Sequence, residues 1–162
     1  MNRAEVVDAL RAARAELLEA IDGLSDSDLA APGVAGDWSV KDILSHVTAC
    51  EAELVRALAQ LKLGRRSDFW DDRTDAEIDA LNAKYQRQNK NKPLRRVLED
   101  FEGVRKQTIK QVESLRDADL TGPFKYARRE GQPLVEFIAG DSFGHERDHI
   151  ADIQNWRQKR SG

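Results

Sequence analysis

The chain has 162 residues, 40% hydrophobic and 34% charged, which suits a single domain spanning residues 1–162. Its net charge of −3 gives no broad attraction to nucleic acid or to an acidic membrane. No apolar run approaches the roughly 18 residues of a spanning helix, and the N-terminus lacks an apolar signal region, so we expect a soluble, cytoplasmic protein. The single cysteine, Cys50, excludes a disulfide framework and leaves any metal to His and carboxylates.

Apolar residues recur at spacings of three and four, while Gly and Pro are sparse, which predicts an all-α fold. The first amphipathic helix should begin after Asn2 as its N-cap and stop at Gly23. The second should begin within a residue of Ser39, which precedes a long apolar stripe, and end at Gly64. Both boundaries therefore rest on a polar cap followed by a glycine stop.

A long connection over residues 64–93 is too polar to be core, and it should hold a short extra helix capped by Thr74. A connection of this length can cross a bundle. The third helix should open with Pro93 at its first position, and the fourth should follow Pro133 and run past Trp156.

Segments 21–29 and 112–120 resemble each other weakly, and each is followed by a proline three residues later. This echo indicates two related helical hairpins. Two hairpins joined by a long connection predict a four-helix bundle, in which four apolar stripes share one core.

The placement of the three histidines carries the main functional signal. His145 and His149 are one helical turn apart, so one divalent ion can take both imidazoles. His46 lies on the shoulder of the second helix's stripe and can also point inward. Three neutral imidazoles would leave an ion its full charge and an open position, as in catalytic sites. The alternative is three ordinary, partly buried or solvent-facing histidines.

Residues 145–149 also match the H-E-x-x-H motif of zinc proteases, in which Glu146 would be the general base. The extended protease form needs Gly at Asp152 and His at Asn155, and no strand is predicted to align a peptide. The protease interpretation is therefore disfavoured. Glu146 remains a candidate general base for a metal-bound water, with an exposed helix carboxylate as the alternative.

Other side chains have both a functional and a structural interpretation. Three carboxylates could orient the imidazole rings or serve as caps and surface residues: Asp42, Asp141 and Asp152. Four residues could line a substrate pocket or belong to the core and the connection: Cys50, Trp70, Tyr85 and Trp156. For Cys50, a fourth metal ligand or a nucleophile is also open. A solvated face, not a nucleic-acid site, is expected for one basic run: Lys84, Arg87, Lys90, Lys92, Arg95 and Arg96.

Residues 36–46, with the sequence GDWSVKDILSH, resemble the second-helix signature of the DinB-like metal-dependent bundle proteins. The pair formed by His145 and His149 is similar to the fourth-helix half of their three-histidine site. Within that superfamily the chain most resembles the ClbS/DfsB family over nearly its whole length. The matching segments are Leu81-Asn82, Asn89, residues 97–101 and residues 138–140.

This resemblance implies an up-down-down-up four-helix bundle, commonly a homodimer, with zinc or nickel on His46, His145 and His149. It also implies a small electrophilic or toxic substrate that is disarmed by hydrolysis or by transfer to a low-molecular-weight thiol. A second hypothesis is a non-catalytic bundle that sequesters such a compound. Neither hypothesis includes nucleic acid or a membrane as a partner.

Overall fold

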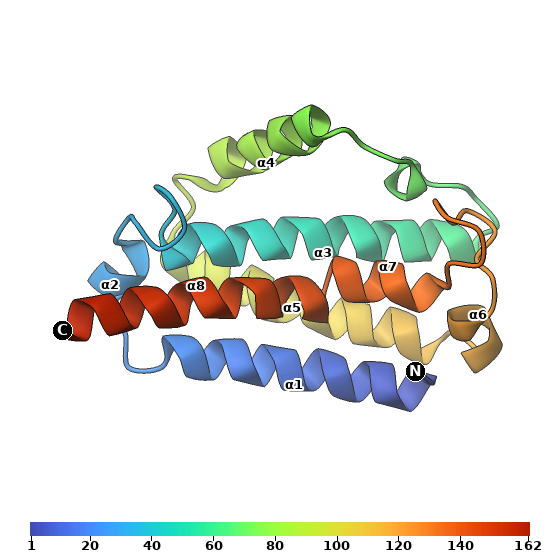
Figure 1. Ribbon diagram of the computed structural model, residues 1–162, viewed down its shortest axis with the longest axis horizontal. Helices are drawn as coiled ribbons and strands as arrows, with labels where there is room; N and C mark the ends of the chain where they lie inside the picture. The colour runs from blue at the N-terminus through green and yellow to red at the C-terminus, as the bar shows by residue number, and fades with distance from the viewer.

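The computed structural model describes residues 1–162, and its regular structure is entirely helical (Figure 1). The elements in chain order are α1 (Arg3–Ile21), α2 (Asp26–Ala30), α3 (Val40–Lys62), the 3-10 turn η1 (Asp68–Trp70), α4 (Asp75–Asn89), α5 (Leu94–Glu113), α6 (Asp117–Thr121), α7 (Leu134–Gly140) and α8 (Phe143–Ser161). The long helices α1, α3, α5 and α8 form a four-helix bundle. Because α1 and α8 run opposite to α3 and α5, the up-down-down-up topology is confirmed.

The connection between α3 and α5 explains why these two helices are parallel. It leaves the end of α3, forms η1, and returns along the outside of α3 as α4 (Figure 1). Thr74 caps α4 as predicted, because its hydroxyl accepts from the Glu77 amide at 3.3 Å. No residue of α4 is buried, so this helix rests on the bundle without joining its core.

The predicted starts of the first two long helices are confirmed. Asn2 caps α1 by accepting from the Glu5 amide at 3.0 Å, and Ser39 caps α3 by accepting from the Asp42 amide at 3.1 Å. Each cap satisfies amides that have no partner within the helix. Pro93 is the N-cap of α5 and not its first residue.

The fourth helix was expected to be continuous, but the chain breaks between α7 and α8. Ser142 at the break adopts a non-helical conformation, and its hydroxyl bonds the Ile138 carbonyl instead. A Cβ on Gly144 would lie 2.7 Å from the Ala139 carbonyl oxygen, so the close approach of the two segments needs glycine there. The two echo segments hold matching short helices, α2 and α6, each directly after a long helix.

The core consists of two apolar clusters, one of 17 buried residues near α6 and α7 and one of 14 near α2. Between them along each long helix lies one buried charged residue, and together these four make the charged layer: Arg14 on α1, Glu51 on α3, Arg105 on α5 and Glu146 on α8. None of the helices combines the length and apolarity needed to span a membrane.

Candidate metal centre

Three imidazoles from two helices meet on one side of the bundle. His46 comes from α3, and His145 and His149 come from α8. The Nε2 atom of His145 lies 3.0 Å from His46 Nε2 and 3.2 Å from His149 Nε2. These are the three rings expected from the sequence, and the fold brings them together from positions about a hundred residues apart.

The spacing of these nitrogens suits one cation. A tetrahedral ion with bonds of about 2.0–2.1 Å to imidazole would hold its nitrogen ligands about 3.3 Å apart. A ring nitrogen that carries a proton can donate to only one neighbour, yet His145 Nε2 has two within reach. A shared cation would satisfy all three lone pairs, so the donor set fits a divalent metal bound by nitrogen.

The electrostatics keep the rings in the form that binds metal. Burial, with a contribution from the neighbouring imidazoles, lowers the pKa of His46 to about 3. The same two causes lower the pKa of His145 to about 4, and burial also lowers the pKa of His149. All three are therefore neutral at pH 7, and no deprotonation is needed before ligation.

A turn before α3 places an aromatic ring against His46. Gly36 adopts a left-handed conformation with φ +58°, and Trp38 donates its amide to the Ala35 carbonyl at 3.0 Å. The Trp38 ring then lies 4.9 Å from the His46 ring, measured between centroids. The contact of Trp38 with the histidine was not predicted from the sequence. The signal was its position two turns before His46.

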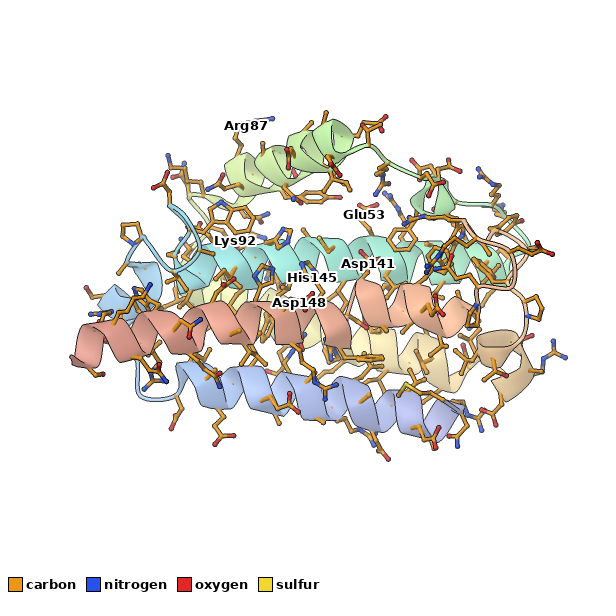
Figure 2. All side chains as sticks on the ribbon, viewed as in Figure 1. Glu53, Arg87, Lys92, Asp141, His145 and Asp148 are labelled. Carbon is orange, nitrogen blue, oxygen red and sulfur yellow. The ribbon has the colours of Figure 1, made fainter.

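The three carboxylates expected around the histidines have different environments. Asp152 Oδ2 lies 3.7 Å from His149 Nδ1, near the ring but beyond hydrogen-bond distance, so its orienting role stays a prediction. Asp141 follows α7 and lines a cavity beside His145. Figure 2 shows both residues on the side of α7 and α8 that faces α3. The expectation for Asp42 is corrected: its carboxylate accepts from the Ser39 amide and hydroxyl, both at 2.9 Å, so it completes the helix cap.

A cavity of about 280 Å³ opens beside the imidazoles, under the connection between α3 and α5. His46, Cys50, Phe69, Asp72, Arg73, Ile78, Leu81, Asn82, Arg128, Gly140, Asp141 and His145 line it. The long connection therefore covers the site and supplies much of its apolar surface. A space of this size admits a small organic molecule.

Four charged groups line this cavity, two of each sign: Asp72, Asp141, Arg73 and Arg128. Arg128 donates to the Phe69 carbonyl at 3.0 Å and lies 3.6 Å from Asp72. These contacts tie the loop that carries Arg128 to η1. Arg73 has no hydrogen-bond or ion-pair partner in the chain, so its guanidinium can contact a ligand. Burial raises the pKa of Asp141 to about 6, although Arg128 and Arg73 oppose the shift. Neither arginine was predicted from the sequence, because neither lies in a recognisable motif.

Cys50 lines the cavity as expected for a pocket residue, but its thiol does not lie with the converging nitrogens. Its Sγ is 3.9 Å from Nδ1 of His46, the ring nitrogen that does not face the other histidines. Burial raises the pKa of Cys50 to about 12, which keeps the thiol protonated. These observations count against the fourth-ligand and nucleophile interpretations. Tyr85 on α4 does not line the cavity, so its predicted place in a substrate pocket is corrected; burial, with a contribution from Glu53, raises its pKa to about 12.

Three predicted site residues belong to the core instead. Glu146 is 0% exposed and its Oε1 accepts from Arg14 Nε at 2.8 Å, so it is a member of the charged layer and neither a general base nor a surface carboxylate. Trp70 is 1% exposed and packs edge-on against Phe124 at 4.9 Å between centroids. Trp156 is buried in the second apolar cluster. Neither tryptophan lines the cavity, because each fills space between helices.

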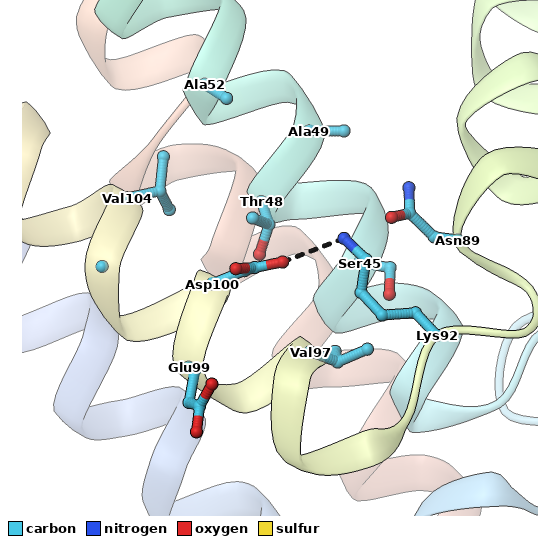
Figure 3. A pocket seen from close by; sticks show the side chains of 11 residues that line it. Ser45, Thr48, Ala49, Ala52, Asn89, Lys92, Val97, Glu99, Asp100 and Val104 are labelled. Carbon is cyan, nitrogen blue, oxygen red and sulfur yellow. Dashed lines mark hydrogen bonds and ion pairs between the residues drawn. The ribbon is translucent and has the colours of Figure 1, made fainter.

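A second cavity, of about 410 Å³, lies between α3 and α5 (Figure 3). Two of its charged groups pair with each other, since Lys92 Nζ lies 2.9 Å from Asp100 Oδ2, and the third, Glu99, lies 3.4 Å from Arg95. Small residues such as Ala49 and Ala52 make up much of its wall on α3. With no imidazole in its lining, this cavity is not a candidate metal site.

The fold and the three-histidine cluster together define a class of helical bundle with a candidate metal site. The chain belongs to the DinB superfamily, because the model of that family matches residues 3–153. Among curated proteins, none matches the chain.

Several solved structures share the fold. The structure named "Sibling Lethal Factor Precursor - DfsB" is 15% identical with a TM-score of 0.85, and the match covers 99% of this chain and 97% of that one. The colibactin self-resistance protein ClbS, solved in complex with a dsDNA, is 12% identical with a TM-score of 0.80, covering 95% and 94%. An uncharacterised protein from Escherichia coli UTI89 is 15% identical with a TM-score of 0.83, covering 99% and 95%. At these identities the likeness shows the fold alone.

Proposed function

We propose that the protein is a metal-dependent enzyme that disarms a small electrophilic or toxic molecule by hydrolysis or by transfer to a low-molecular-weight thiol. The observation that carries the proposal is the convergence of three neutral imidazole nitrogens, 3.0 and 3.2 Å apart, beside a small cavity. His46, His145 and His149 would hold the ion, with zinc or nickel as the expected metal. The name of ClbS, a self-resistance protein of the same fold, supports a detoxification role.

A bound divalent ion would supply Lewis acidity at an open coordination position. The chain's own residues would do the rest. Asp141, with a pKa of about 6, is largely ionised at pH 7 and would accept the proton that water or a thiol gives up. Phe69 and Leu81 would bind the apolar part of the substrate, and Arg73 would hold a negatively charged part.

Turnover tests the proposal. Metal-free protein reconstituted with zinc or nickel would be incubated with a small epoxide or activated aryl halide, with and without a cysteine-type thiol. We expect catalytic consumption in the metal-loaded protein and at least a tenfold slower rate in Asp141→Asn, which should keep its metal. Cys50→Ser is the matched control and should stay close to the wild-type rate, because this thiol is protonated and directed away from the Nε2 atoms.

The alternative is a bundle that sequesters the compound without turning it over. The cavity of about 280 Å³ supports binding equally well. Stoichiometric capture without turnover, unchanged in His46→Gln, would support this alternative and contradict the enzyme.

Nucleic acid is a further ligand class to consider, because ClbS was solved with a dsDNA. We keep the prediction that this chain does not bind it. Several basic residues of the run 84–96 are paired with acids, since Arg96 Nε lies 3.2 Å from Asp100 and Arg95 lies 3.4 Å from Glu99. Salt-dependent retention of a labelled duplex would contradict this prediction. The homodimer and the cytoplasmic location also stay predictions; light scattering on purified protein tests the first.

A further inference from the structure

The two helices that carry the histidines are not each other's main packing partners. α3 packs chiefly against α5, and α1 packs chiefly against α8, with only sparse contact between α3 and α8. Imidazole nitrogens from α3 and α8 nevertheless lie 3.0 Å apart. A small shift of one helix along the other would separate them, so something else in the bundle must fix how α8 lies against α3.

The charged layer links these same two helices. Arg105 donates to Glu51 on α3 through Nε at 2.7 Å, and its Nη2 lies 3.0 Å from Glu146 on α8. Arg14 does the same from the other side, donating to Glu51 at 3.1 Å and to Glu146 at 2.8 Å. Each arginine therefore bridges α3 to α8. Each is also anchored on a backbone carbonyl, Arg14 on that of Phe101 and Arg105 on that of Leu10.

The layer and the histidines lie at the same level of the bundle. Glu146 directly follows His145 on α8, and Glu51 lies about one and a half turns after His46 on α3. The carboxylates are buried in the core, and the imidazoles of His46 and His145 line the cavity. The same two helices are thus joined on the inside by arginines and are placed to be joined on the outside by an ion.

We propose that Arg14, Glu51, Arg105 and Glu146 are positioning residues that set α8 against α3 at the spacing one metal ion requires. This inference rests on the proposed metal site. Guanidinium–carboxylate pairs have a fixed planar geometry, so they define a single register, whereas apolar side chains can pack in several. The layer also leaves Oε2 of Glu146 buried without a partner, a cost that stability alone would not favour.

An all-methionine layer separates positioning from stability. Replacing a buried ionic network by apolar residues of similar volume is often neutral or stabilising. We therefore expect R14M/E51M/R105M/E146M to unfold at the wild-type urea concentration or higher, yet to bind cobalt(II) at least ~10-fold more weakly, the size of effect known for residues that support metal ligands. The absorption bands of the bound cobalt(II) should also broaden as the geometry becomes heterogeneous.

A single substitution covers the case in which the fourfold variant fails to fold. Glu146→Gln keeps the size of the side chain but removes its charge, and we expect a ~10- to 100-fold loss of cobalt(II) affinity. Val112→Ala, a buried position in the first apolar cluster away from the histidines, is the matched control for destabilisation. It should lower stability and leave cobalt(II) affinity within twofold.

The outcomes are distinguishable. If the wild-type protein itself fails to bind cobalt(II) or zinc, the proposed function is wrong. If the wild-type protein binds and Glu146→Gln, or a folded methionine layer, binds equally well, the positioning role is wrong. Equal losses of affinity in Glu146→Gln and Val112→Ala would also overturn it, because affinity would then follow stability only.

Discussion

The inner and outer faces of the pair formed by α3 and α8 differ in how far their polar groups are paired. On the inner face, two carboxylates and two guanidiniums meet at 2.6–3.2 Å and are nearly excluded from water. On the outer face, the imidazole nitrogens face mainly one another beside a cavity, and Nδ1 of His149 has no hydrogen-bond partner. Groups that pair with one another, apart from the unpartnered Oε2 of Glu146, build the fold. Groups that converge without satisfying each other are the ones available to a ligand.

The largest expected effect comes from breaking the inner face. Arg105→Met removes a guanidinium and leaves Glu51 and Glu146 as buried charges with one partner fewer. The free energy of unfolding should fall by about 3–5 kcal/mol, the range found when one partner of a buried ion pair is lost. Urea unfolding followed by circular dichroism measures it. The guanidinium of Arg95 is almost fully exposed, so Arg95→Met should change stability by less than ~0.5 kcal/mol. Equal losses of stability in the two variants would contradict the difference between the buried and the exposed arginine.

At neutral pH, breaking the outer face should matter only when metal is present. Zinc at about 100 times its dissociation constant should stabilise the wild-type protein by about 2.7 kcal/mol, because it binds the folded state alone. His46→Gln should lose this increment while its metal-free stability stays near that of the wild type. Urea unfolding with zinc and with a chelator gives both values. An undiminished zinc effect in His46→Gln would exclude this histidine as a ligand.

The sequence predicted the outer face better than the inner one. Histidine is rare enough that three of them on two amphipathic helices form a visible pattern, and the caps at Asn2 and Ser39 mark helix starts locally. Charged residues are common, so Glu51 and Glu146 resembled surface residues. Glu51 and Glu146 face the core, while their neighbours Cys50 and His145 line the cavity.

A signal for the inner face was nevertheless present. Arg14 lies four residues after Leu10 and three before Leu17, so it occupies a core position of its helix. Arg105, four residues after Phe101, and Glu51, three before Leu54, repeat this pattern. One charge at a core position in each of four helices, with two of each sign, predicts a buried neutral layer. The break before Ser142 had no such signal, because it depends on the packing of α7 against α8.

Acid should also reduce the stability of the metal-free protein through the outer face. The pKa of His46 in the metal-free folded protein, about 3, lies below the value of about 6.5 in the unfolded chain. The unfolded state therefore binds more protons, and the stabilising effect of the neutral ring, present above pH 6.5, is lost as the pH falls. Between pH 7 and 5 the loss is about 2 kcal/mol for this ring. Metal-free His46→Gln should lose correspondingly less free energy of unfolding between pH 7 and 5. Parallel curves of stability against pH for this variant and the wild type would contradict the lowered pKa of His46.

The smallest expected effect concerns the cover of the cavity. Thr74→Ala removes the cap of α4, a helix with no buried residue, and should weaken that helix by about 1 kcal/mol. Hydrogen exchange of the α4 amides should speed up about fivefold while amides in α5 stay unchanged. Uniform acceleration across both helices would show that the cover and the bundle open together.

The most direct test of the central claim is anomalous scattering from crystals of zinc-loaded protein, measured on both sides of the zinc absorption edge. We predict one strong peak about 2.0–2.1 Å from Nε2 of each of His46, His145 and His149. A peak bound elsewhere, or no peak at the three rings in fully loaded protein, would contradict the assignment of this cluster as a metal centre.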